Sequence, residues 1–248
     1  MVYREAGSGG VPLLILHGLG SNHIQFEDDV EYFSKCRRVI QPDLRGHGDT
    51  GSPPHATVAD FTCRKMAEDV AYLLDQLGIS RVDMVGNSLG GNIALELIDL
   101  RPGLARSLTT FGTTYRLCVP KFILPIRDII YWYLGDSLPR WAAEKTSKTS
   151  QGRDVLTRTF SQMHKRTSKL IGPNICKFDY LHVAERFEGH ILLLQCKGDK
   201  DINATLKPTL QTLSKLERAK VEPFETGGHC CNVDDPEEFH RRIDGFLE

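Results

Sequence analysis

Short, continuous runs of apolar residues alternate along this chain with longer stretches in which apolar residues recur every three or four positions. A run that is apolar at nearly every position is typical of a strand covered on both faces, and the longer period is typical of an amphipathic helix. The expected strands cover residues 11–16, 38–44, 81–85, 108–111, 191–196 and 221–224. The alternation predicts an α/β fold, with a mostly parallel sheet and helices on both of its faces.

Turn and capping residues mark the ends of the expected helices. Residues 61–77 carry apolar side chains at helical spacing and stop at Gly78, and residues 92–100 form a second helix. Near the end of the chain, Asp235 and Pro236 supply an N-cap and a first helical position for a final helix.

The alternation breaks between Arg116 and Glu185, where no buried strand is evident. Aromatic and basic stretches occupy this region instead, and we interpret it as a helical insertion over the sheet. We expect the aromatic stretch Tyr131 to Tyr133 to pack in the core of the insertion rather than against a substrate. We expect the Lys/Arg excess at residues 145–169 to form a solvated face.

The composition is that of an ordinary globular protein, since 40% of the 248 residues are hydrophobic and 25% are charged. The formal net charge is -1, so no overall field favours nucleic acid or an anionic membrane, and we expect a small-molecule substrate in a pocket as the partner. The first ten residues lack the pattern of a signal peptide, and the apolar stretch 119–134 is too short and too charged to span a bilayer. These features predict a cytoplasmic protein without membrane contact. The seven Cys residues have no metal or redox spacing and are expected to be free thiols.

The segment Gly86-Asn87-Ser88-Leu89-Gly90 has the form of a nucleophile elbow, a sharp turn that lifts a serine hydroxyl clear of the sheet. The bare pattern would arise by chance in roughly one chain in ten of this length, so it is weak alone. An expected buried strand before it and a helix after it supply the context that the motif requires. We therefore predict Ser88 as a nucleophile.

A serine hydroxyl needs a base to remove its proton, and the base needs a carboxylate that orients it. His229 and Asp201 each follow an expected strand, at the carboxyl ends where open α/β sheets place their sites. The order serine, acid, histidine is the one expected with a nucleophile elbow. We predict His229 as the base and Asp201 as the orienting acid. Asp199 and an acid on the strand after Leu108 remain alternatives for the acid.

Charge that develops on a substrate carbonyl oxygen needs backbone N–H donors to stabilise it. The candidate donors are the N–H of Leu89, next to the nucleophile, and the N–H of Leu19, which lies between two glycines after the first strand. His17 and His47 are expected to support their loops rather than to transfer protons. The remaining histidines lack metal-ligand spacing, so we expect no metal and no other cofactor.

Five ordered motifs together resemble the α/β-hydrolase superfamily, and the resemblance covers the chain from Tyr3 to its end apart from the insertion. The motifs are His17-Gly18, Asp43-Leu44-Arg45-Gly46-His47-Gly48, Gly86-Asn87-Ser88-Leu89-Gly90-Gly91, Gly198-Asp199-Lys200-Asp201, and Gly228-His229 with Asp235-Pro236-Glu237-Glu238-Phe239. The resemblance implies an eight-stranded sheet with a helical cap between the sixth and seventh strands. It divides the chain into core residues 1–115, cap residues 116–185 and core residues 186–248. Because the family's first edge strand precedes the strand matching residues 2–5, we expect that edge strand to be missing.

We expect a serine hydrolase that cleaves a carboxylic ester or lactone of a small hydrophobic molecule through an acyl-enzyme. Superfamily members with the same three residues also include carbon–carbon bond hydrolases, lyases, perhydrolases and slow-turnover small-ligand receptors, which remain alternatives. The elbow sequence is similar to that of hydrolases acting on ring-fission products, but those carry Trp after the histidine, where this chain has Cys230. The sequence indicates neither the size of the substrate nor the oligomeric state.

Overall fold

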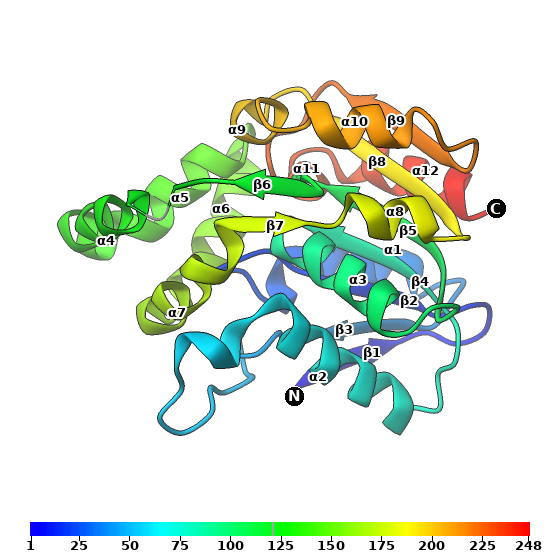
Figure 1. The fold of residues 1–248 in the computed structure, drawn as a ribbon, viewed down its shortest axis with the longest axis horizontal. Helices are drawn as coiled ribbons and strands as arrows, with labels where there is room; N and C mark the ends of the chain where they lie inside the picture. The colour runs from blue at the N-terminus through cyan, green and yellow to red at the C-terminus, as the bar shows by residue number, and fades with distance from the viewer. Residues whose placement is uncertain (121) are drawn as a thin grey trace.

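The computed structural model describes residues 1–248 except Lys121, and it describes the backbone alone at residues 123, 127, 128, 131 and 132. Within the described residues, seven strands form the central sheet, in the order β1-β3-β2-β4-β5-β8-β9 (Figure 1). The strands are β1 (Tyr3–Ala6), β2 (Leu13–Leu16), β3 (Val39–Pro42), β4 (Val82–Asn87), β5 (Ala105–Phe111), β8 (His190–Cys196) and β9 (Ala219–Phe224).

The sheet is mostly parallel, which confirms the predicted fold class. Only the pairing of the edge strand β1 with β3 is antiparallel, with Tyr3 opposite Pro42, and every other neighbouring pair of this sheet is parallel. In the part of the chain that the structure describes, no strand precedes β1. The sheet therefore has seven strands, as expected if the family's first edge strand is missing.

Helices cover both faces of the sheet, and the central strands β2 and β4 are buried at every position as a result. In β2, Leu14 and Leu16 join one buried cluster, whereas Leu13 and Ile15 join the other. The first cluster packs under α2 (Cys63–Gln76) and α3 (Leu89–Leu100), which lie in front of the sheet in Figure 1. The second packs under α1 (Glu27–Phe33) and α12 (Pro236–Leu247), which lie behind it.

The helix boundaries differ from the sequence prediction by a few residues. The stretch expected to form one helix at residues 61–77 divides at Thr62, whose side chain caps α2 by accepting from the Lys65 N–H. A short 3₁₀ helix, η2 (Val58–Phe61), precedes it. The helix after the elbow begins at Leu89, three residues before the predicted start at residue 92.

In the described residues between Arg116 and Cys176, four α-helices lie toward one end of the sheet in Figure 1, and α8 (Leu181–Arg186) follows them. The four are α4 (Ile123–Leu134), α5 (Leu138–Thr146), α6 (Ser150–Ser161) and α7 (Lys165–Ile175), with the 3₁₀ helix η3 (Gly135–Ser137) between the first two. Two strands flank these helices in the chain, β6 (Arg116–Cys118) before them and β7 (Lys177–Asp179) after them, and the two strands pair antiparallel. The sequence analysis missed these strands, because a three-residue strand with exposed ends leaves no buried apolar run.

Side-chain exposure tests two further expectations for this region. Lys145, Lys148 and Lys169 are exposed, as the prediction of a solvated basic face requires. Tyr133 is 82% exposed, so the interpretation of the aromatic stretch as buried core is wrong for this residue. The side chains of Tyr131 and Trp132 lie outside the described residues.

One buried carboxylate ties the loop between α5 and α6 to the core. Oδ1 of Asp234, the last residue of α11 (Cys231–Asp234), accepts from the Ser147 hydroxyl at 2.5 Å and from the Lys148 N–H at 2.9 Å. It also accepts from both the N–H and the hydroxyl of Thr149. The other oxygen, Oδ2, accepts from the Gly228 N–H at 2.7 Å. The same side chain therefore fixes residues 147–149 and the residue that precedes His229.

We predict that Asp234→Asn lowers the free energy of unfolding by about 2–4 kcal/mol, because a carboxamide has only one oxygen for these five donors. The NH₂ group of the asparagine would face at least one of these N–H or hydroxyl donors, and that donor would lose its acceptor. Urea unfolding of the variant measures the loss, and Asp154→Asn, an exposed carboxylate on α6, is the matched control with an expected change within about 0.5 kcal/mol. Equal stability of the two variants would contradict the role assigned to Asp234.

Candidate active site

Ser88 occupies a strained turn between β4 and α3. Its φ of 51° and ψ of -115° lie in a region that costs a non-glycine residue about 1–3 kcal/mol. The turn persists because α3 lies directly against the strands: a Cβ on Gly90 would collide with the backbone of Leu16, and one on Gly86 would collide with the backbone of Gly91. Ser88 itself is partly exposed between buried neighbours, as the predicted elbow requires.

His229 pairs with Asp199 rather than with the predicted Asp201. Nδ1 of His229 lies 2.7 Å from Oδ2 of Asp199, which is buried. Asp201 is exposed in the first turn of α9 (Lys200–Asn203), so the choice of Asp201 as the residue orienting His229 is wrong in this structure. The other alternative also fails, because β5 carries no acidic residue after Leu108.

The start of α9 explains why the nearer aspartate takes this position. Asp199 is the N-cap of α9, and its Oδ1 accepts from the Ile202 N–H at 3.3 Å. This contact leaves Oδ2 free to meet the imidazole. The helical turn that begins at Lys200 then carries Asp201 toward solvent. A capping aspartate directly after a strand is the sequence signal that could have identified the acid.

Asn87 holds the histidine loop against the elbow, a role that the sequence analysis missed. Its Nδ2 donates to the carbonyl oxygen of His229 at 3.1 Å and to that of Phe111 at 3.2 Å. Its Oδ1 accepts from Nε2 of Gln25 at 3.1 Å, so the amide is held from both sides. Gly112, with a φ of 58°, leaves room for this contact, because a Cβ there would lie 2.6 Å from the His229 carbonyl oxygen.

These contacts bring the backbone of His229 next to Ser88. Among the described residues the Ser88 hydroxyl forms no hydrogen bond, so the imidazole of His229 and this hydroxyl are not hydrogen-bonded in the structure. Such contacts are often long without substrate and tighten in the bound complex. Cys230, the next residue, is buried, and burial raises the pKa of its thiol well above the ordinary value, so the thiol stays protonated at neutral pH.

The two expected N–H donors come from segments that flank the serine. Leu89 is the first residue of α3, where a backbone N–H has no partner within the helix. The loop that carries Leu19 passes beside the elbow, because a Cβ on Gly18 would lie 3.4 Å from Cβ of Ser88. A helix N-terminus and a glycine-flanked loop are both suited to stabilise a developing anion.

His17 and His47 support their loops, as expected. Nδ1 of His17 donates to the Gly18 carbonyl at 2.8 Å, and Nε2 accepts from the Leu44 N–H at 3.0 Å. The rings of His17 and His47 meet edge to face at 5.1 Å. Burial lowers the pKa of His17 to about 4 and that of His47 to about 3, so both rings are neutral near pH 7.

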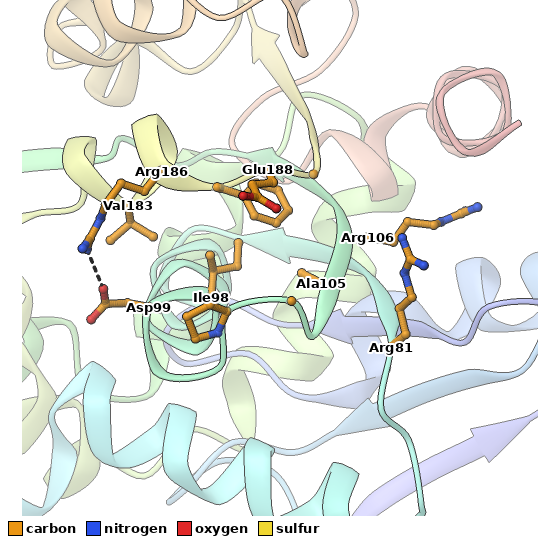
Figure 2. A pocket seen from close by; sticks show the side chains of 12 residues that line it. Arg81, Ile98, Asp99, Ala105, Arg106, Val183, Arg186 and Glu188 are labelled. Atoms are coloured by element: carbon orange, nitrogen blue, oxygen red, sulfur yellow. Dashed lines mark hydrogen bonds and ion pairs between the residues drawn. The ribbon is translucent and has the colours of Figure 1, made fainter.

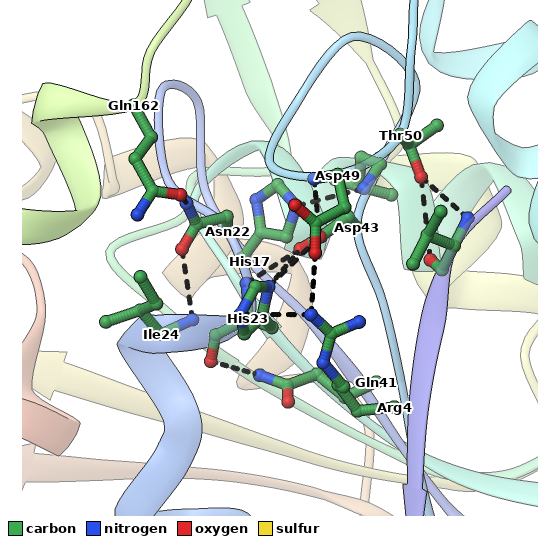
Figure 3. Close-up of polar contacts among 12 residues, drawn as sticks. Arg4, His17, Asn22, His23, Ile24, Gln41, Asp43, Asp49, Thr50 and Gln162 are labelled. Atoms are coloured by element: carbon green, nitrogen blue, oxygen red, sulfur yellow. Dashed lines mark hydrogen bonds and ion pairs between the residues drawn. The ribbon is translucent and has the colours of Figure 1, made fainter.

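A cluster of His23, Asp43 and Asp49 lies at the edge of the sheet near β1 (Figure 3). Its three potential ligand atoms lie within 4.8 Å of one another. Asp43 already accepts from the N–H groups of His23 and Asp49, and Nη2 of Arg4 donates to Asp49 at 2.6 Å. These contacts satisfy the carboxylates with protein donors, so the cluster links β1, through Arg4, to the segments that carry His23 and Asp49.

The pocket in Figure 2 lies at the amino ends of the strands, whereas the predicted site lies at their carboxyl ends. It has a volume of about 650 Å³ and is lined by Arg81, Ala105 and Gly189, which lie at the amino ends of β4, β5 and β8. Ser88 and Asp199 follow the carboxyl ends of β4 and β8. This pocket therefore does not open onto the predicted nucleophile.

Comparison with known proteins identifies the family. Residues 11–203 match the family model of the alpha/beta hydrolase fold. The chain is also 39% identical over 256 residues to the protein named "Putative carbamate hydrolase RutD" from Pseudomonas savastanoi pv. phaseolicola, covering 95% of this chain and 93% of that protein. The chain belongs to the α/β-hydrolase fold family.

Two further relatives of this α/β hydrolase differ in how much of their length they share. A soluble epoxide hydrolase from Corynebacterium sp. is 30% identical over 161 residues, which cover 60% of this chain and 51% of that enzyme, so the chain spans about half of it. The enol-lactonase from Burkholderia xenovorans LB400 superposes with a TM-score of 0.86 over 99% of this chain and 95% of the other, at 19% identity. At that identity the likeness establishes the fold alone.

We predict that the α/β hydrolase loses stability as the pH falls below about 6.5, because His17 and His47 bind protons more readily in the unfolded chain than in the folded one. Between pH 6.5 and 4 each contributes up to about 1.4 kcal/mol of loss per pH unit. Urea unfolding at pH 7 and pH 5 measures the difference, which should shrink in the His17→Gln/His47→Gln variant. It should not shrink in His182→Gln, an exposed control, and an unchanged difference in the double variant would contradict the assignment.

We predict that Asp199→Asn lowers kcat of the hydrolase by about 10³–10⁴-fold, because the imidazole of His229 loses the carboxylate that fixes its orientation. Asp201→Asn is the matched control and should retain activity within about twofold, since its side chain is exposed. Steady-state kinetics with one chromogenic substrate compares the two variants. A large loss in Asp201→Asn with little change in Asp199→Asn would reverse the assignment.

Proposed function

We propose that this protein is a serine hydrolase that cleaves a carboxylic ester or lactone of a small hydrophobic molecule through an acyl-enzyme. The observation that carries the proposal is the 2.7 Å pair of Asp199 and His229, held beside the elbow whose strained backbone presents Ser88. A buried carboxylate on Nδ1 favours the tautomer whose Nε2 accepts a proton. This arrangement suits activation of a hydroxyl rather than transfer of an electron or a hydride.

In the first step, Oγ of Ser88 attacks the substrate carbonyl carbon while Nε2 of His229 takes the hydroxyl proton. The N–H groups of Leu19 and Leu89 stabilise the oxyanion, each worth about 10²–10³ in rate. The intermediate then collapses, the C–O bond to the leaving alcohol breaks, and His229 returns its proton to that alcohol. With a lactone, the alcohol stays attached to the acyl group.

In the second step, water attacks the acyl-enzyme with His229 again as the base. The bond to Ser88 Oγ breaks, the serine regains its proton, and the carboxylic acid leaves. Throughout both steps Asp199 stays ionised, because its function is to orient the imidazole and to stabilise its charged form.

A carbamate is a second candidate substrate, favoured by the 39% identity to the RutD protein over nearly the full length of both chains. Its carbonyl would react with Ser88 through the same two steps, with an amine or alcohol as the leaving group. The fold shared with the enol-lactonase is compatible with a lactone but does not select it. Substrate choice among these classes depends on pocket shape rather than on the three reacting residues.

We predict that Ser88→Ala reduces turnover of a short-chain chromogenic ester by at least about 10⁴-fold without unfolding the protein. Relief of the strained turn is too small a change to disrupt the fold. Initial rates and circular dichroism measure the two properties, and Ser214→Ala, an exposed serine, is the matched control. Retained turnover in Ser88→Ala would remove Ser88 from the mechanism.

The substrate class is then resolved by a screen of wild type and Ser88→Ala over ester chain length, lactone ring size and carbamates. Product analysis separates hydrolysis from lyase, perhydrolase or carbon–carbon cleavage chemistry. A ligand that raises the thermal midpoint but gives negligible product would favour a small-ligand receptor over an enzyme.

A further inference from the structure

Helix α4 presents an apolar surface that no other part of the described chain covers. We define the α4 patch as Phe122, the residue before α4, together with Ile126, Ile129, Ile130 and Tyr133 of α4, all of which are exposed. Their spacing of three and four residues places them along one side of a helix. Phe122 is 71% and Ile129 is 64% exposed. A contiguous apolar surface of this kind marks an interaction site more often than scattered single residues do.

The patch is a concentration of exposed apolar residues rather than part of a general pattern. Six of the eleven large hydrophobic side chains that are exposed in the described part of the chain lie between residues 122 and 141, the sixth being Trp141. The others are scattered at Met1, Val2, Val58, Tyr72 and Val221. Helix α4 also lies at the outer end of the molecule in Figure 1, away from the sheet.

Basic side chains lie on α7, which contacts α4, and on the neighbouring helices α5 and α6. Residues 135–170, which follow α4, contain eight Lys or Arg and three Asp or Glu, although the whole chain has a net charge of -1. Lys165, at the start of α7, donates to the carbonyl of Gly135 directly after α4, at 3.4 Å. Lys145 of α5 lies over the ring of Trp141, which is exposed but is not one of the patch residues, at 5.9 Å from its centroid. Positive charge therefore adjoins the apolar surface.

This combination distinguishes between two possible occupants. A second copy of the chain, packed patch to patch about a twofold axis, would bring the two basic helix surfaces together and add repulsion between like charges. An anionic lipid surface attracts the basic side chains and also accepts the apolar ones at the boundary between headgroups and acyl chains. In the described residues, no helix is long and apolar enough to cross a bilayer, so the contact would lie in the plane of the surface.

We propose that the α4 patch and the adjoining basic residues dock this protein on an anionic phospholipid surface. The proposal revises the expectation of no membrane contact, which was based on the total charge and on the lack of a bilayer-spanning stretch and not on how the charge is distributed. It is independent of the reaction at Ser88, because none of the patch residues belongs to the elbow or to the loops of Asp199 and His229.

Co-sedimentation with vesicles tests the proposal. We expect the wild type and Ser88→Ala to bind vesicles of phosphatidylcholine with phosphatidylglycerol, to bind phosphatidylcholine alone at least about 10-fold more weakly, and to lose affinity as salt is raised. Ile126→Ser/Ile129→Ser should bind at least about 10-fold more weakly, because it removes apolar surface from the patch. Lys165→Gln/Lys169→Gln should weaken binding only to the anionic vesicles.

Two controls make the outcome decisive. Tyr72→Ser removes an exposed aromatic side chain on α2 and should leave vesicle binding unchanged, and thermal unfolding verifies that each variant is folded.

Absence of wild-type binding to anionic vesicles, or equal binding by Ile126→Ser/Ile129→Ser, would overturn the proposal. So would a wild-type dimer in gel filtration that this variant converts to a monomer, because the patch would then be an interface between copies. Loss of ester turnover in Ser88→Ala with vesicle binding retained separates this proposal from the proposed function.

Discussion

The close contact between α3 and the strands beneath it is the constraint on which the candidate site depends. Ser88 can keep its strained backbone only because glycines at positions 86 and 90 let the helix lie against β4 and β2 without side chains between them. The same contact buries the apolar residues of α3 and so stabilises the turn through the core of the protein. The strain therefore persists in a region that has little freedom to relax, which is the condition under which such conformations survive.

Two buried side chains then hold the loop that carries His229, each through a different backbone group. Asn87 holds the carbonyl of His229 toward the elbow, and Asp234 holds the N–H of Gly228 toward the loop between α5 and α6. Because Asp234 also accepts from residues 147–149, a shift of that loop would displace Gly228, the residue that precedes His229. The region above the sheet is thus coupled to the predicted base through a carboxylate that takes no part in the reaction.

The parts of the fold that could be predicted are those in which burial leaves a pattern in the sequence. The apolar runs at β2 and β4 and the glycines of the elbow each follow from local chemistry, and the structure has them where expected. Asp199 and Asp201 are two residues apart, and their difference arises from where α9 begins, which motif spacing does not specify. The motif gives no sign of the contacts of Asn87, because its partners Gln25 and His229 are far away in the chain.

The helices of the insertion differ in whether they pack against the core. Leu156, Phe160 and Ala143 form a buried cluster with Cys230, the residue after His229, so α5 and α6 are packed against the site. None of the α4 side chains that the structure describes belongs to a buried cluster. A contact made by α4 can therefore form or dissociate without disturbing the packing that places His229. This separation would let one insertion combine a rigid wall beside the site with a surface free to engage lipid.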